Sequence, residues 1–475
     1  MNARRTWVIA WFALFVAPSI ALAVSVTGTD WIVHFNLPDQ VSGVYPGEFA
    51  IRDALLARIN ALQTNDEATL ATYTFSGNSA SEGAAGPVLQ AISNALARGV
   101  KMGFIADNGI DVGYKYWPSV SLSNLAARAQ NPLNLSQAPL APGIMHDKLG
   151  AFRYAGSNQW VFVTSWNFTG GASTYQWNIA LEVRNDDLYA AYTNEMGQML
   201  AGHFHDDPAK SHAFDRSLFR LADSWTNGWV RFAPYPDGRA SGNNAQTDIT
   251  NLIGNAKSEI VFGLNDLTRP LIRDALIAAA NRGVSIHGSM PKNDTDPGGN
   301  SDAIYEYLTN TTHYLTANIV HFVMPFSKAD GSAVDTGEVD LIHEKWMVID
   351  PWSSTPWLIH GSANWSDAAL VSTNSNDENI VFVPHKDIAR MFYAEFKRMT
   401  GTWTNRDDFW CDIGLTNGSL RAGLWMTDTN GFILQRADDI GAWTSAGGAI
   451  TGFVGYLSVL TNDVDPKAFY RATRQ

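Results

Sequence analysis

The chain has 475 residues, of which 45% are hydrophobic, and a formal net charge of −13 at pH 7. This length and apolar content suffice for one large core or two packed ones. The acidic balance disfavours a general nucleic-acid binder, because phosphate backbones reward clustered Lys and Arg, but it is compatible with a local basic pocket. The single cysteine, Cys411, excludes an internal disulfide, so the fold depends on its apolar core.

The N-terminus, residues 1–23, has the pattern of a cleavable secretory signal. Arg4 and Arg5 precede an apolar run over 7–17, and Ala21-Leu22-Ala23 forms an A-x-A cleavage site. An uncleaved anchor helix is the alternative, which the short apolar run and an interrupting proline disfavour. The sequence therefore predicts a secreted protein, extracellular or periplasmic.

Two regions share the same succession of predicted helices and strands. In each, a helix begins near a proline and ends before Arg-Gly-Val, and a buried strand follows. Three further strands and a long amphipathic helix complete each region. The first region comprises helix 86–98, strands 101–106, 148–155, 160–163 and 178–183, and helix 188–204; the second comprises helix 269–282, strands 285–290, 345–350, 357–360 and 379–383, and helix 388–399.

This alternation predicts an α/β fold, and the duplication predicts two similar lobes that face each other. The N-terminal lobe is expected over 24–205 and the C-terminal lobe over 241–400. An inter-lobe linker is expected over 206–240, where prolines interrupt regular structure. Residues 401–475 have no counterpart in the first half and are predicted to form an appendage of unknown role.

A short set of polar residues occurs once in each lobe. The first copy consists of His146, Lys148, Ser165 and Asn167, and the second consists of His343, Lys345, Ser362 and Asn364. A lone His-x-Lys on a strand usually has no function, and Ser-x-Asn after a strand usually marks a turn. Because both elements occur twice, at matching places in matching halves, the pattern indicates one shared active site.

The residue types in this pattern suit phosphodiester chemistry. His and Lys two positions apart project from one face of a strand, so two such strands would present two imidazoles and two ammonium groups to one volume. One neutral imidazole can attack phosphorus and form a phosphohistidine, while the other donates a proton to the leaving oxygen and later activates water. The lysines would neutralise the phosphate oxygens, and the Ser and Asn side chains would add hydrogen bonds. This arrangement requires no metal and no other cofactor.

The second copy, His343, Lys345 and Asp350 followed by Gly361-Ser362-Ala363-Asn364, resembles the H-x-K-x4-D and G-S-x-N pattern of the phospholipase D superfamily. The resemblance covers roughly residues 30–400. It implies two α-β-α sandwich lobes related by a pseudo-twofold axis, with the active site between them and a phosphohistidine intermediate. It also implies that Glu378 is the downstream acid that orients a catalytic histidine. Carried over from bacterial secreted phospholipases D, His146 is the nucleophile and His343 the general acid and base.

The first copy departs from the family pattern at three positions. Arg153 stands where the Asp belongs, Thr164 replaces the Gly, and Trp177 aligns with Glu378 of the second half. The family Asp supports the fold more than the chemistry, and Thr164 is expected to narrow one side of the pocket. Trp177 would remove an orienting carboxylate, for which Asp147 or Glu182 could substitute.

Three functions are compatible with the sequence. The leading hypothesis is a secreted, monomeric phospholipase D that hydrolyses phospholipid head groups at a membrane or micelle surface and can also transfer the phosphatidyl group to an alcohol. The 17 Trp residues either fill the core or form a rim that meets lipid. A secreted endonuclease of the same superfamily is less favoured, because its channel would carry a basic stripe. Arg153 and Trp177 keep open a third hypothesis, a catalytically silent binder of phosphate-bearing ligands.

Overall fold

In a computed structural model, the chain forms two compact units. One is Ala23–Thr402, and the other groups Trp403–Gln475 with Met1–Leu22. The structure describes residues 25–36, 49–77, 83–116, 120–140, 143–155, 158–174, 176–205, 207–235, 242–290, 341–373 and 376–400, two single positions at 304 and 308, and short strands between 320 and 322 and between 409 and 474. The predicted signal over 1–23 lies outside the described residues. Within them, no helix is long and apolar enough to cross a membrane.

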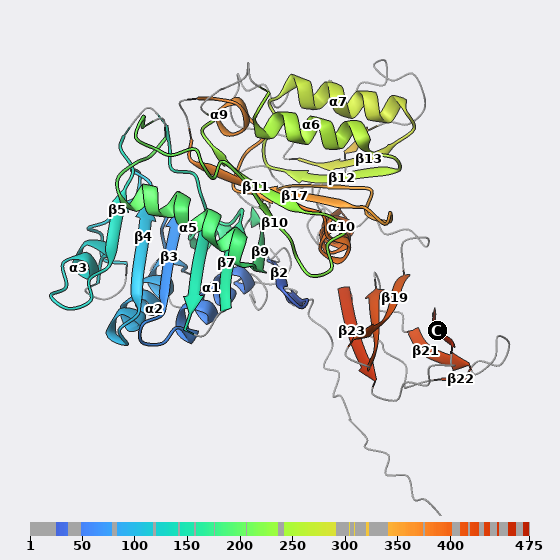
Figure 1. Cartoon of the computed structure of the whole chain (residues 1–475), viewed down its shortest axis with the longest axis horizontal. Coiled ribbons are helices and arrows are strands. Elements are labelled where there is room, and N and C mark those ends of the chain that lie inside the picture. Colours follow the sequence, from blue (N-terminus) through green and yellow to red (C-terminus); the bar gives the residue numbers. More distant parts are fainter. Residues whose placement is uncertain are drawn as a thin grey trace, which may run out of the picture. The chain divides into compact units, whose positions relative to one another are not determined.

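The first lobe is built on an eight-stranded mixed sheet (Figure 1). Its strands, in spatial order, are β1 (Ser25–Thr27), β2 (Trp31–Phe35), β9 (Ile179–Arg184), β7 (Asn158–Thr164), β6 (Leu149–Tyr154), β3 (Glu67–Thr72), β4 (Lys101–Ala106) and β5 (Asn134–Gln137). Its helices are α1 (Ala50–Ala61), α2 (Ala85–Ala97), α3 (Leu122–Ala126), α4 (Gly170–Thr174) and α5 (Asp186–Leu200).

The second lobe repeats this sheet strand for strand. Its spatial order is β10 (Arg216–Phe219), β11 (Gly228–Ala233), β18 (Glu378–Val383), β17 (Trp357–Gly361), β16 (Lys345–Ile349), β12 (Glu259–Leu264), β13 (Ser285–Ser289) and β14 (Val320–Phe322). Its helices are α6 (Ala245–Asn255), α7 (Pro270–Asn281), α9 (Asp367–Leu370) and α10 (Lys386–Thr400). The predicted pair of similar α/β lobes is therefore confirmed.

Each sheet is covered by helices on both faces (Figure 1). The pair α1 and α2 covers one face of the first sheet, and α5 contacts β4 and β7 from the other; α6, α7 and α10 do the same for the second sheet. The closing helices also join the lobes, because α5 contacts β11 and α10 contacts β2. These helix–strand contacts pack the two lobes against each other.

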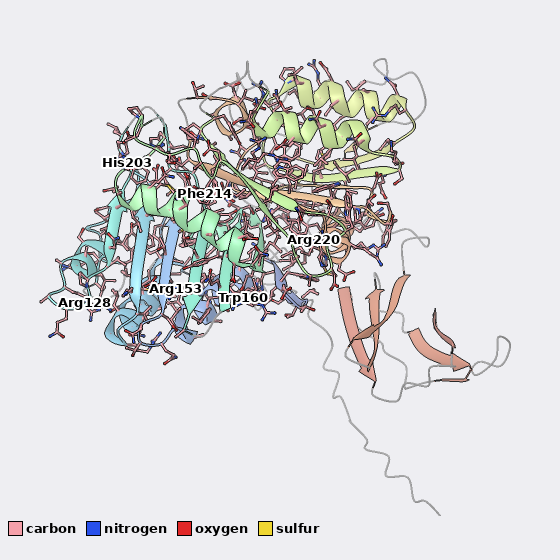
Figure 2. All side chains as sticks on the ribbon, in the orientation of Figure 1. Arg128, Arg153, Trp160, His203, Phe214 and Arg220 are labelled. Atoms are coloured by element: carbon pink, nitrogen blue, oxygen red, sulfur yellow. The ribbon has the colours of Figure 1, made fainter. Side chains whose placement is uncertain are left out.

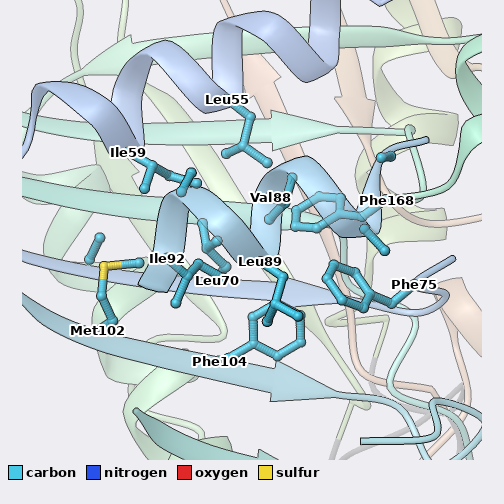
Figure 3. Packing of buried hydrophobic residues seen from close by; sticks show 14 of the residues in the cluster. Leu55, Ile59, Leu70, Phe75, Val88, Leu89, Ile92, Met102, Phe104 and Phe168 are labelled. Carbon is cyan, nitrogen blue, oxygen red and sulfur yellow. The ribbon is translucent and has the colours of Figure 1, made fainter. Parts of the chain in front are cut away.

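The core of the first lobe follows from apolar residues at helical spacing. Leu55 and Ile59 of α1 and Val88 and Ile92 of α2 are fully buried against the sheet residue Leu70 (Figure 3). Burying each such side chain stabilises the fold by about 1.5–3 kcal/mol. The second lobe has an equivalent cluster between its sheet and α6 and α7.

Glycines end the equivalent helices α2 and α7 in the two lobes. Gly99 and Gly283 have φ of +87° and +96°, a left-handed conformation that costs a glycine little. Val100 and Val284 then enter the buried strands that follow. The Arg-Gly-Val pattern in the sequence therefore marked two real helix ends.

Residues 206–240 do more than link the lobes. This segment contains β10 and β11, and β11 pairs with β18 from Trp229↔Phe382 to Ala233↔Glu378. Part of the expected linker therefore belongs to the second sheet. The sequence patterns predict neither β11 nor its counterpart β2, so comparison of the two halves does not reveal this strand.

Asp350 shapes the backbone of the second lobe, away from the histidines. Its carboxylate accepts hydrogen bonds from the backbone N–H groups of Lys257, Ser258 and Glu259, at 2.7–3.1 Å, just before β12. Its counterpart Arg153 forms an ion pair with Glu67. Figure 2 shows Arg153 at the side of the first lobe that faces away from the second.

We expect the change Asp350→Asn to lower the free energy of unfolding by about 2 kcal/mol, because a buried carboxylate that accepts several backbone N–H bonds loses its charge. Arg153→Ala should cost at most about 1 kcal/mol, since the Arg153 side chain is 41% exposed and its ion pair is screened by water. Urea unfolding of both variants measures the difference. Equal losses would contradict the fold role of Asp350.

The described residues of the unit Trp403–Gln475 form two three-stranded sheets. One contains β19 (Phe409–Thr416), β20 (Ser419–Met426) and β23 (Gly455–Thr461), and the other contains β21 (Phe432–Ala437), β22 (Thr444–Ser445) and β24 (Phe469–Arg474). Neither the sequence of this appendage nor its strand arrangement indicates a function.

Candidate active site

The two histidines lie just before the central strands β6 and β16. At these positions, a short backbone segment of one lobe pairs with a segment of the other lobe. Met145 forms an isolated parallel bridge with Asp377, and His146 N–H donates to the Asp377 carbonyl (3.0 Å). In the reciprocal arrangement, β15 (Leu341–Ile342) pairs with β8 (Gln176–Trp177), and His343 N–H donates to the Trp177 carbonyl (3.0 Å). The expectation that His and Lys share a strand of the main sheet is wrong, since His146, Lys148 and His343 precede the sheet strands.

The His146 ring is held by a carboxylate of the opposite lobe. His146 Nδ1 donates to Glu378 Oε1 (2.7 Å), and Ser362 Oγ donates to Glu378 Oε2 (2.7 Å). His146, Ser362 and Glu378 are all at least nine-tenths buried. This geometry fixes the tautomer with hydrogen on Nδ1 and leaves Nε2 as the reactive nitrogen.

The His343 ring is held by an amide. Asn178 Nδ2 donates to the Ala172 carbonyl (2.9 Å), so Asn178 Oδ1 is the acceptor for both Ser165 Oγ (2.9 Å) and His343 Nδ1 (3.1 Å). His343 therefore also carries hydrogen on Nδ1. The two histidines have the same geometry but different partners, one charged and one neutral.

The predicted alignment of Trp177 with Glu378 is wrong by one residue. Thr164 pairs with Ala180 in the first sheet, and its counterpart Gly361 pairs with Ile380 in the second. Asn178 is therefore equivalent to Glu378, and Trp177 is equivalent to Asp377. Trp177 is buried and contributes its carbonyl to His343. The sequence concealed this register, because Asn178-Ile179 matches Asn379-Ile380 although the two pairs are one residue out of step in the sheets.

Neither proposed substitute for the missing carboxylate approaches His343. Glu182 forms ion pairs with His34 and with Arg58 inside the first lobe. Asp147 Oδ1 accepts a hydrogen bond from Asn379 Nδ2 (2.6 Å), on the Glu378 side of the site. Asn178 is therefore the side chain that orients His343 through Nδ1.

Both lysines lie beside the histidine of their own motif. Lys148 Nζ donates to the His146 carbonyl (2.7 Å), and Lys345 Nζ donates to the His343 carbonyl (2.8 Å). Burial lowers the pKa of Lys148 to about 8, against the opposing charges of Glu378 and Asp147. Burial and then the charge of Lys148 lower the pKa of Lys345, so the two cations lie within each other's field. An anion between them would be strongly favoured.

The serines and asparagines of the motifs divide into two kinds. Ser165 and Ser362 are fully buried and bind the groups that orient the histidines, rather than facing a substrate as predicted. Asn167 is 9% exposed, and its Oδ1 has no hydrogen-bond partner among the described residues. Asn364 Oδ1 accepts a hydrogen bond from Asn265 Nδ2 (3.3 Å). The asparagines are therefore the better candidates for substrate contact.

Two further features bear on the pocket. The Thr164 hydroxyl donates to the Ile179 carbonyl (2.8 Å), so it is occupied by its own backbone, and the structure gives no sign of the expected narrowing. Tyr73, which the sequence did not single out, lies edge-on to the His146 ring with centroids 4.8 Å apart, and Lys148 Nζ lies 5.3 Å from its ring centroid. Tyr73 follows β3 directly, and because the sequence patterns predict no strand there, no sequence signal indicated it.

Burial dominates the ionisation of both histidines. It lowers the pKa of His146 well below its usual value, and Lys148 and Lys345 lower it further. The same causes lower the pKa of His343, with Lys345 ahead of Lys148. Burial also raises the pKa of Glu378 to about 7. Among the described side chains, no group of three or more His, Cys, Asp and Glu is arranged to hold a metal ion.

The comparison with solved structures supports the two-lobe fold. Phosphatidylserine synthase from Haemophilus influenzae matches with a TM-score of 0.50 and 10% identity, over 74% of this chain and 85% of that chain. Polyphosphate kinase from Porphyromonas gingivalis matches with a TM-score of 0.49 and 13% identity, over 75% of this chain and 46% of that one, so this chain spans about half of the kinase. The phospholipase D family member Nuc from Salmonella typhimurium matches with a TM-score of 0.26 and 21% identity, over 36% of this chain and 93% of that chain.

The family assignment rests on sequence. No curated protein matches the chain. The family model described as cardiolipin synthase, PLD-like domain, matches residues 55–200 and 249–400, one segment in each lobe and well over half of the chain together. Both segments contain a complete His, Lys, Ser and Asn motif. The chain therefore belongs to the phospholipase D superfamily, whose members act on phosphodiesters.

Proposed function

We propose that this protein hydrolyses the head-group phosphodiester of phospholipids through a phosphohistidine, as a phospholipase D, at a membrane surface outside the cell. The observation that carries the chemical part of the proposal is the reciprocal hold on the two rings. Each histidine is fixed at Nδ1 by the opposite lobe, by Glu378 or by Asn178, so both Nε2 atoms are available for chemistry.

The charged partner suits His146 to the role of nucleophile. When His146 Nε2 bonds to phosphorus, the imidazole becomes positively charged, and the Glu378 carboxylate at 2.7 Å from Nδ1 stabilises that charge. The lowered pKa keeps His146 neutral and nucleophilic at pH 7. Phosphorus then loses its bond to the oxygen of the head-group alcohol.

The neutral partner suits His343 to proton transfer. Asn178 Oδ1 orients the ring without a charge that would retain the proton on Nε2. His343 Nε2 gives its proton to the departing alcohol, later takes one from water, and the resulting hydroxide displaces His146 from phosphorus. The products are a free head-group alcohol and phosphatidic acid. An alcohol in place of water would give phosphatidyl transfer.

Substrate binding favours uptake from solvent of the proton that this step requires. Burial is the first cause of the lowered pKa of His343, and the positive charges of Lys345 and Lys148 are the next. A phosphodiester anion between the two ammonium groups offsets their charges and raises the pKa of His343. The bound substrate therefore favours the protonated form of His343 more than the empty site does.

The lipid substrate is supported by sequence features outside the site. The acidic balance of −13 disfavours a polyanionic substrate such as nucleic acid, and the N-terminal pattern of a secretory signal fits a protein that meets lipid outside the cell. The carboxylates that act on Lys148 are Glu378, Asp147 and Asp107, which further disfavours a densely negative ligand.

The test is the release of choline and phosphatidic acid from phosphatidylcholine vesicles, with EDTA present throughout. We expect release by the mature protein and none by a His146→Ala control. Single-stranded DNA is offered in a parallel reaction, because its degradation without lipid hydrolysis would instead favour the nuclease. Failure to act on either substrate, or on phosphatidylethanolamine and phosphatidylglycerol vesicles, would contradict the proposal.

A further inference from the structure

Asp147, between the motif residues His146 and Lys148, belongs to a buried network behind the catalytic histidine. Its side chain is fully buried, and Oδ1 accepts a hydrogen bond from Asn379 Nδ2 at 2.6 Å. Asn379 is buried as well. A buried carboxylate is costly unless it is hydrogen-bonded, and this cost makes Asp147, beside the reacting groups, a candidate for a functional role.

The shortest hydrogen bonds of the network run in one direction, although Ser362 Oγ also lies 3.4 Å from Asp147 Oδ1, a longer alternative to its bond with Glu378. Tyr192 Oη donates to Asn379 Oδ1 (2.9 Å), which places the Asn379 amide hydrogens toward Asp147 and toward Ser362 Oγ (3.1 Å). Ser362 accepts there and donates its own hydrogen to Glu378 Oε2 (2.7 Å). Each link polarises the next, which strengthens a chain of hydrogen bonds in a low-dielectric interior.

Among the described residues, the side-chain amide that links this network has no counterpart on the other side of the pseudo-twofold axis. Glu344, the counterpart of Asp147, accepts a hydrogen bond from Trp346 Nε1 (2.7 Å). The counterpart of Asn379 is the apolar Ile179, because Ser165 N–H donates to the Ile179 carbonyl as Ser362 N–H donates to that of Asn379. The side-chain amide link is therefore missing behind His343, which is a second difference between the half-sites besides the exchange of Glu378 for Asn178.

We propose that Asp147, Asn379 and Tyr192 are positioning residues for His146, which act through Ser362 to hold Glu378 in line with Nδ1. The inference rests on the proposed phosphohistidine chemistry and adds a second carboxyl group to the nucleophile's side of the site. Asp147 touches neither the substrate nor His146 through its side chain. It fixes Glu378, and Glu378 fixes the ring.

Electrostatics give this link a measurable signature. Burial raises the pKa of Asp147 to about 7, the hydrogen bond from Asn379 opposes the shift, and the charges of Glu378 and Asp377 add to it, while Lys210 opposes it. A negative Asp147 therefore disfavours ionisation of Glu378. Removing that charge lowers the pKa of Glu378 and moves the acidic limb of the activity profile to lower pH.

Two variants test the proposal, Asp147→Asn and Tyr192→Phe. Both keep the shape of the side chain, and Tyr192→Phe changes no charge at pH 7. The matched control is Tyr189→Phe on the same helix α5, whose phenol interacts with Arg153 outside the network. The substrate is bis(p-nitrophenyl) phosphate, which requires only phosphodiesterase activity, and ¹⁵N NMR reports the tautomer of the His146 ring.

We expect kcat to fall about tenfold or more in Asp147→Asn, since small misplacement of a reacting group has large effects, with KM little changed. The acidic limb should move to lower pH, and the Nδ1–H tautomer of His146 should lose population in both variants but not in Tyr189→Phe. Wild-type kcat, pH profile and ¹⁵N shifts in Asp147→Asn and Tyr192→Phe would overturn the proposal. The two proposals fail separately. A wild-type protein that is inactive on every phosphodiester would refute the proposed function. The NMR readout needs no turnover, so the population of the His146 Nδ1–H tautomer in the variants would still test the positioning role of Asp147.

Discussion

The His343→Ala variant should release close to one equivalent of p-nitrophenol from bis(p-nitrophenyl) phosphate and then nearly stop. Nitrophenol leaves without a proton, so attack by His146 proceeds without the acid, whereas hydrolysis of the phosphohistidine still needs a base to activate water. General acid–base catalysis contributes about 10²–10⁴-fold, so steady-state turnover should fall by that factor. Phosphorylated enzyme should accumulate on His146.

The His146→Ala variant supplies the opposite result, because without its nucleophile the protein should show neither a burst nor steady turnover. Rapid-quench measurement of nitrophenol, followed by mass spectrometry at alkaline pH where phosphohistidine survives, identifies the labelled residue. A burst in His146→Ala with the label on His343 would reverse the two roles. Labelling of neither histidine in any variant would exclude the covalent route.

The fold was largely predictable because duplication doubles every local signal. The proline at the start and the Arg-Gly-Val at the end of helices α2 and α7 occur in both lobes, so each copy supports the other. The edges of the sheets were not predictable. Strands β1 and β10 are three and four residues long, and such short edge strands carry little periodicity.

The site was predictable in its reacting residues and not in its supporting ones. His146 and Lys148 recur as His343 and Lys345, and a repeated pair is visible in sequence. The partner of each ring lies in the other lobe, 232 residues away for Glu378 and 165 for Asn178. No local pattern encodes a hydrogen bond of that span. Sequence spacing placed Trp177 opposite Glu378, and only the pairing of the strands in space corrected the alignment by one residue.

The difference between the two ring partners leads to the second large effect, that of Glu378→Gln. Loss of the carboxylate beside His146 should lower kcat by about 10³–10⁴-fold, comparable to the loss of the buried carboxylate in a Ser-His-Asp triad. Asn178→Ala should lower kcat only about tenfold, because it removes one neutral hydrogen bond from His343. Steady-state kinetics of both variants, with thermal unfolding as a check of the fold, measure the contrast.

The pH dependence of these variants separates charge from geometry. Burial raises the pKa of Glu378 to about 7, so wild-type activity should fall as the pH drops below about 7 and the carboxylate gains a proton. Glu378→Gln, which cannot titrate at this position, should lose that limb and keep only its low residual rate. Asn178→Asp makes the complementary change, because a new charge beside His343 would retain the proton on Nε2 and slow the release of a poor leaving alcohol. The rate of Asn178→Asp with phosphatidylcholine should therefore fall more than its rate with bis(p-nitrophenyl) phosphate. An equal fall with both substrates would show that His343 does not donate the proton.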